Sequence, residues 1–116
     1  AAPGADARVP ALDGGTTLLI DPVEIAYAEA DRDRSILVLR DGRRVGSPRS
    51  LRALEDALPP GFLRIHRSQI VNLACVAALE PAGEGRVQAR LADAEGTTLD
   101  VARRQTRTLR EALGLR

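Results

Sequence analysis

Residues 62–73 read FLRIHRSQIVNL, and this stretch decides how the chain is interpreted. Residues 63–66 alternate between apolar and basic side chains, as expected for a strand with one buried face. The strand gives way to the polar triplet His66-Arg67-Ser68, which contains the only histidine, and apolar residues resume at Ile70. The pattern predicts a short strand whose end presents an arginine beside a polar turn.

The composition indicates one globular domain. The chain has 116 residues, 44% of them apolar, which is enough for a single hydrophobic core. That core must consist mainly of Leu, Val, Ile and Ala, since Tyr27 and Phe62 are the only aromatic residues. The scarcity of aromatic side chains argues against a stacking platform for single-stranded nucleic acid.

The cations are all of one kind and are unevenly distributed. All 17 basic residues are arginine, whose planar and permanently charged fork suits phosphate or the guanine edge, although a GC-rich genome explains the bias equally well. The net charge is only +1. Residues 100–110 nevertheless hold four arginines against one aspartate, whereas residues 80–95 hold two arginines against four carboxylates. The positive charge is therefore concentrated in patches.

The single cysteine and the absence of export signals indicate a cytoplasmic location. Cys75 has no second cysteine with which to form an intramolecular disulfide, and its apolar neighbours predict a packing role. No stretch approaches the roughly 20 apolar residues of a membrane span. The amino end lacks the basic-then-apolar pattern of a signal peptide.

The chain divides into an amino-terminal segment and one folded domain. Residues 1–15 are expected to form a linker or flexible segment, because residues 1–12 are rich in Ala, Pro and Gly and Asp13-Gly14-Gly15 is a turn signal. The folded domain is expected to cover residues 16–116. A linker there suggests a further domain upstream, although a plain frayed terminus is as good an explanation.

Short apolar bursts of period two predict eight strands. The expected strands are residues 16–20, 25–30, 35–40, 43–47, 62–65, 76–79, 86–92 and 97–101. Asp41-Gly42 predicts a tight hairpin, and longer turns are expected at residues 81–85 and 93–96.

Two stretches show helical spacing instead. Ser47-Pro48, followed by leucines at positions 51, 54 and 58, predicts a capped helix that lies on the sheet and stops at about Leu58. Residues 103–113 predict a second helix, with Gly114 as its stop. That helix carries arginines at positions 103, 107 and 110 on one face.

The residues do not form a catalytic constellation. His66 and Ser68 stand two residues apart in an extended segment, and the sequence has no glycine-flanked serine elbow and no second histidine. No Cys/His/Asp cluster has metal-ligand spacing, and Asp13-Gly14-Gly15 lacks the lysine and helix start of a phosphate-binding loop. We therefore expect no catalysis, no metal site and no cofactor.

Four segments, in order and spacing, resemble the LytTR family of bacterial DNA-binding domains over roughly residues 16–113. They are the opening motif, IAYAEA at residues 25–30, RSLRALEDAL at residues 49–58, and LDVARR at residues 99–104. The last three resemble the family's I-x-Y-I-E-A strand, its short-helix segment and its closing I-P-V-S-R-R. The resemblance implies a mainly β, elongated domain of small antiparallel sheets with one or two short helices, whose loops enter the major grooves of duplex DNA.

The resemblance also implies roles for individual residues. The arginines at base-reading positions are Arg34, in the loop after the first family strand, Arg67 and Arg103. A guanidinium at a strand edge suits a bidentate contact to O6 and N7 of guanine, whereas a solvated charged loop is the alternative for Arg34. Phosphate contacts are expected from Arg49, Ser50, Arg64, Ser68, Arg104 and Arg107, with turn or cap hydrogen bonds as the alternative for the two serines. His66 and Asn72 are expected to orient loops.

The sequence departs from the family pattern at Ala28, Gln69 and Ala102, and the last two changes could alter one phosphate or base contact. The expected function is sequence-specific binding of double-stranded DNA, as the output domain of a bacterial response regulator or sensor with a signal-receiving domain upstream. The resemblance implies tandem imperfect repeats as the target and a homodimer on DNA. The alternative is an all-β interaction module whose arginines engage an acidic protein without binding DNA.

Overall fold

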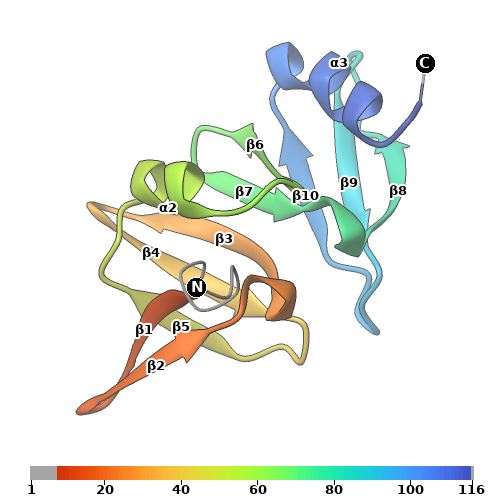
Figure 1. Ribbon diagram of the computed structural model, residues 1–116. Helices are drawn as coiled ribbons and strands as arrows, with labels where there is room; N and C mark the ends of the chain where they lie inside the picture. Colours follow the sequence, from red (N-terminus) through yellow and green to blue (C-terminus); the bar gives the residue numbers. More distant parts are fainter. Residues whose placement is uncertain (1–7, 116) are drawn as a thin grey trace.

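The computed structural model describes residues 8–115, which fold into two antiparallel β-sheets with two α-helices (Figure 1). The molecule is elongated, with principal extents of 45 × 29 × 27 Å. The predicted fold class, a mainly β domain of small antiparallel sheets with short helices, is confirmed.

The larger sheet contains seven strands in the order β2-β1-β5-β4-β3-β7-β6. Its strands are β1 (Val9–Asp13), β2 (Thr16–Ile20), β3 (Ile25–Asp31), β4 (Arg34–Leu39), β5 (Arg44–Ser47), β6 (Phe62–His66) and β7 (Gln69–Asn72). β3 joins the two halves of this sheet, because it pairs with β4 on one side and with β7 on the other, where Glu29 lies opposite Gln69. Consequently the tips of the β3–β4 and β6–β7 hairpins lie at the same end of the sheet.

The smaller sheet follows in sequence and leads into the last helix. Its strands, in the order β10-β9-β8, are β8 (Val76–Pro81), β9 (Val87–Leu91) and β10 (Thr98–Val101). The helical segments are the 3-10 turns η1 (Pro22–Glu24) and η2 (Leu73–Cys75) and the α-helices α2 (Leu51–Ala57) and α3 (Arg103–Ala112). All eight expected strands are present, with ends shifted by no more than two residues. β1 and β7 are two further strands that the alternation does not indicate.

The amino-terminal end corrects the expected linker. Val9–Asp13 form β1, which pairs with β2 along its length, and Val9 and Ala11 are 1% and 0% exposed. Small and imino side chains hide the strand pattern, while Gly14, with φ of 60°, supplies the turn into β2. The folded domain therefore begins before residue 16, and residues 1–7 lie outside the described part of the chain.

Helix α2 also begins later than expected. Ser50, not Ser47, is its N-cap, and the Ser50 hydroxyl accepts the backbone N–H of Ala53 at 3.1 Å. Ser47 instead ends β5, where it is buried and its hydroxyl accepts the N–H of Arg49 at 3.3 Å. Both serines precede the helically spaced leucines, so the sequence pattern alone does not decide which serine is the N-cap of α2.

Two hydrophobic cores hold these elements together. The first packs α2 on the larger sheet through Leu51 and Leu54, which are 4% and 0% exposed. The second lies between the two sheets and α3, and it includes Ile65 of β6, Leu99 of β10 and Leu109 of α3. Each fully buried aliphatic side chain stabilises the fold by roughly 1.5–3 kcal/mol, so this second core holds α3 firmly beside β6.

Candidate nucleic-acid interface

The β6–β7 turn presents the triplet His66-Arg67-Ser68 on an ordered backbone. His66 Nδ1 accepts the backbone N–H of Ser68 at 3.2 Å and lies 2.8 Å from the Ser68 hydroxyl oxygen. The Ser68 carbonyl accepts the N–H of Ala30 in β3 at 2.9 Å. These contacts link the His66 ring to Ser68 within the turn. Within residues 8–115, the exposed Arg67 guanidinium makes no hydrogen bond or ion pair.

Arg64 lies beside this turn, and its guanidinium is bonded to other groups of the protein. Its guanidinium donates from Nε to the His66 carbonyl at 3.3 Å and from Nη2 to the Arg67 carbonyl. Nη1 lies 3.2 Å from Oε1 of Glu55, which α2 contributes. The side chain is only 26% exposed. Sequence reasoning missed Glu55, because no local pattern indicates which helix residue will face β6.

The first residues of α3 lie against β6, which brings a second arginine to the turn. The backbone N–H of Ala102 donates to the carbonyl of Ile65 at 2.8 Å. Ala102 is the N-cap and offers no side-chain hydrogen bond to the helix, whereas the serine common in the family could cap it. Seven residues line one hollow at this junction: Glu55, Arg64, His66, Arg67, Ala102, Arg104 and Gln105. Arg104 is exposed, and its guanidinium makes no hydrogen bond or ion pair within the described chain.

Arg103 does not join this hollow. Its Nη2 donates to the carbonyl of Glu84 in the β8–β9 loop at 2.7 Å. Successive residues of a helix point about 100° apart, so Arg103 shares its face with Arg107 and Arg110 rather than with Arg104. Arg107 is paired with Glu111 at 3.1 Å, with a side chain that is 92% exposed. The structure therefore separates Arg103 and Arg107 from Arg67.

Arg34 and Arg49 lie at the same end of the larger sheet as the β6–β7 turn. Arg34, expected in the loop before this strand, is instead the first residue of β4, and it pairs with Asp31 at the hairpin tip. The hydroxyl of the buried Ser35 donates to the carbonyl of Arg49 at 2.8 Å, which holds the segment before α2 beside this tip. The backbone of Arg34 is fixed by strand pairing, and the backbone of Arg49 is held by the partly buried hydrogen bond from Ser35.

Two further expected site residues have internal partners. Ser50 caps α2 through its hydroxyl, as described above. Asn72 is 6% exposed; its side-chain amide donates to the carbonyl of Ile25 at 2.9 Å, and its oxygen accepts the N–H of Ala74 at 3.0 Å. Asn72 therefore links the η2 turn to the start of β3.

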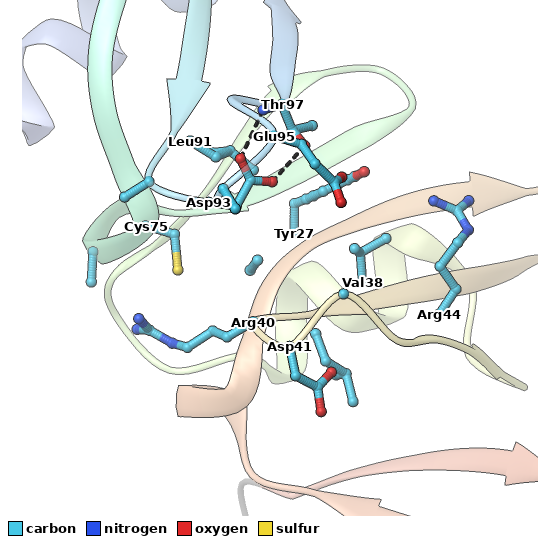
Figure 2. Close-up of a pocket in the computed structure, with 16 residues that line it drawn as sticks. Tyr27, Val38, Arg40, Asp41, Arg44, Cys75, Leu91, Asp93, Glu95 and Thr97 are labelled. Atoms are coloured by element: carbon cyan, nitrogen blue, oxygen red, sulfur yellow. Dashed lines mark hydrogen bonds between the residues drawn. The ribbon is translucent and has the colours of Figure 1, made fainter.

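A separate groove lies between the two sheets at the opposite end of β3 and β4 (Figure 2). Figure 2 shows Asp93 bonded to Thr97 on its wall, and these hydrogen bonds lower the pKa of the Asp93 carboxyl. Burial raises the pKa of the Cys75 thiol, which disfavours the thiolate, and burial together with Glu29 raises the pKa of the Tyr27 hydroxyl. The cysteine in this groove is thus poorly suited to act as a nucleophile.

Residues 8–115 contain no group of three or more His, Cys, Asp or Glu side chains that could hold a metal ion. Within the same residues, no helix is long and apolar enough to cross a membrane.

Comparison with known proteins places this arrangement in a family. The family model described as the LytTr DNA-binding domain matches residues 15–114. A solved LytTr DNA-binding domain from Bacillus cereus shares the fold, with a TM-score of 0.80 and 22% identity over 93% of this chain and 97% of that one.

Three relatives are described as transcriptional regulators. The heme-containing CO-sensing transcriptional regulator RcoM 1 of Paraburkholderia xenovorans is 34% identical over 109 residues, which cover 93% of this chain and 40% of that protein. The CO-responsive transcriptional regulator RcoM of Rhodospirillum rubrum is 35% identical over 116 residues, 99% of this chain and 48% of that protein. The transcriptional regulatory protein BtsR of Escherichia coli is 29% identical over 107 residues, 92% and 43% respectively.

The chain spans less than half the length of these relatives. The family model, by contrast, covers nearly all of the chain, and it describes a class of DNA-binding domains and not a class of enzymes. The chain therefore belongs to the LytTR family of DNA-binding domains.

Proposed function

We propose that this domain binds double-stranded DNA in a sequence-specific way and that Arg67 and Arg104 together read bases in the major groove. The observation that carries the proposal is the hollow at the junction of β6 and α3. Two exposed guanidinium groups, with no partner within residues 8–115, border it from two separate elements. Unpaired arginine forks on fixed backbone are suited to bidentate contacts with guanine O6 and N7.

The proposal assigns the base-reading role on α3 to Arg104 rather than to Arg103. Family motif position favours Arg103, but its guanidinium is held on the β8–β9 loop and faces away from Arg67. Arg104, expected only to contact phosphate, lines the hollow with Arg67. Arg34 is retained as a third base-reading residue, since it lies at the hairpin tip at the same end of the sheet.

Phosphate contacts would position the domain around these residues. Arg49 borders the same end of the sheet and is the strongest candidate, whereas the Ser68 hydroxyl, at the same end, already lies 2.8 Å from His66 Nδ1. Ser50 and Arg64 have internal partners, and Arg107 lies on the far face of α3, so these three contribute less.

The test is a selection from a randomised duplex library, followed by sequencing and run at two salt concentrations. Enrichment of a guanine-containing motif, with affinity that falls steeply as salt rises, is the expected result. The absence of enrichment together with the absence of duplex binding at low salt would refute the proposal.

We also propose the wider setting that the family suggests. The domain would act in the cytoplasm as the output domain of a longer bacterial regulator, with a receiver or sensor domain upstream, and it would bind tandem imperfect repeats as a homodimer. The relatives named above support a regulatory role, since each is described as a transcriptional regulator. Footprinting of the full-length protein on its own promoter region tests the repeats and the stoichiometry.

The second candidate function is binding of an acidic protein, and the far face of α3 favours it. Arg103, Arg107 and Arg110 line a hollow there, next to Leu115, which is 42% exposed. This face is separate from the arginines of the β6–α3 junction. If no duplex is enriched, loss of partner binding in Arg110→Glu would support this function.

A further inference from the structure

We propose that Arg64 is a positioning residue for Arg67. Arg64 links the backbone of the β6–β7 turn to α2 and does not contact DNA. The inference rests on the proposed function, because it explains how the base-reading side chain is oriented. It replaces the phosphate contact that the sequence predicts for Arg64.

The first observation is that every carbonyl of the turn is bonded. Arg64 accounts for two of them, those of His66 and Arg67, and the N–H of Ala30 accounts for the third, that of Ser68. The two peptide planes that flank the Arg67 Cα therefore cannot rotate without breaking a hydrogen bond. The direction in which the Arg67 side chain leaves the backbone is fixed, as a bidentate contact to one base requires.

The second observation is that the hydrogen bonds at position 64 depend on the planar guanidinium of arginine. Three nitrogens of the one guanidinium have separate partners, since Nε and Nη2 bind neighbouring carbonyls while Nη1 pairs with Glu55 at 3.2 Å. A lysine ammonium keeps the charge but cannot place donors in these three directions from one rigid plane. The substitution Arg64→Lys therefore separates geometry from charge.

The third observation concerns the surroundings of the charge. The Arg64 side chain is 26% exposed, and the Glu55 carboxylate lies between α2 and the guanidinium at the rim of the same hollow. A carboxylate at contact distance offsets the positive charge and repels a phosphate. Arg64 is therefore poorly placed as a phosphate contact and well placed as a link between α2 and the turn.

The experiment measures affinity for the duplex that the wild-type domain selects and for a random duplex, each over a range of salt concentrations. We expect Arg64→Lys to weaken binding to the selected duplex about tenfold and to the random duplex less than twofold, with an unchanged salt slope. A phosphate contact predicts the opposite: Arg64→Lys close to wild type, and Arg64→Gln weakening both duplexes equally with a salt slope smaller by about 0.9. That result would overturn the inference.

Arg52→Gln is the matched control for the loss of one charge. Arg52 is an exposed residue of α2 and has no hydrogen bond or ion pair within residues 8–115. We expect this variant to leave the ratio of the two affinities unchanged. A drop in that ratio as large as the drop in Arg64→Lys would show that the ratio responds to changes elsewhere on this surface and not to the geometry of the turn, and would overturn the inference.

Glu55→Gln provides an independent variant if Arg64→Lys unfolds. It keeps the shape of the side chain but removes the charge that holds the guanidinium. We expect faster exchange of the Ser68 amide, which donates to His66 Nδ1, and a two- to fivefold loss on the selected duplex alone. Tighter binding to both duplexes would show that Arg64 had been freed for phosphate and would overturn the inference. If the wild-type domain selects no duplex, the proposed function itself fails, which is a distinct outcome.

Discussion

Removing either arginine at the start of α3 deletes the same charge from adjacent positions, yet we expect different effects. Arg104→Ala should weaken binding to the selected duplex by about 5- to 150-fold, because a bidentate contact to guanine contributes about 1–3 kcal/mol of discrimination. Arg103→Ala removes one surface hydrogen bond, from Nη2 to the Glu84 carbonyl at 2.7 Å. Such a bond contributes about 0.5–1.5 kcal/mol to stability and nothing direct to base recognition, so affinity should stay within about twofold.

The assay is fluorescence anisotropy on the selected duplex and on a scrambled duplex of the same length, at one fixed salt concentration. Each variant then serves as the charge control for the other. Repeating the library selection with Arg104→Ala should show relaxed preference at one base position and retained preference elsewhere. Equal losses for the two variants on the selected duplex, or an Arg104→Ala loss that is just as large on the scrambled duplex, would refute the reasoning.

Three further predictions concern stability. Ser50→Ala should lower the free energy of unfolding in urea by about 1 kcal/mol, because the hydroxyl caps α2, and Ser50→Asp should restore most of the loss. Leu109→Ala should cost about 2–5 kcal/mol by the same assay, since Leu109 is 0% exposed in the core between the sheets. Burial raises the pKa of the Cys75 thiol. The buried neutral thiol therefore contributes its full stabilisation below the unfolded-state pKa. This contribution is lost as the pH rises past about 8.5, because the thiol of the unfolded chain ionises first. The stability of Cys75→Ala should fall less over that range, and an identical decline in both proteins would contradict this.

The strands that the sequence predicts are those in which side-chain alternation reflects burial on one face. Val9–Asp13 escape this signal because a proline and an alanine replace the usual bulky strand residues, and β1 forms only through its pairing with β2. The alternation does not identify the cap of α2 either, since Ser47 and Ser50 both precede the leucines. Ser50 is the cap because Ser47 belongs to β5 and is paired within the sheet.

The sequence motif predicts where the candidate site lies, but it does not predict which residues contact one another there. The strand-to-turn pattern of residues 62–73 locates Arg67 at the β6–β7 turn. The choice between Arg103 and Arg104, by contrast, depends on which way α3 faces after it packs through Leu109. Such long-range contacts, like the one between Glu55 and Arg64, leave no periodic trace in the sequence.

The hydrogen bond from Ala102 to Ile65 joins the start of α3 to β6, and Ile65 belongs to the hydrophobic core that lies between the two sheets and α3. Arg67 is carried by the turn at the end of β6, whereas Arg104 is carried by α3, which packs against β6 through Leu109. The spacing between these two guanidinium groups is therefore set by how α3 packs against β6. A conservative change in the apolar filling between them, remote from any DNA atom, could shift which base step the domain prefers without removing a single arginine. New sequence preferences can thus arise in this protein by repacking its interior.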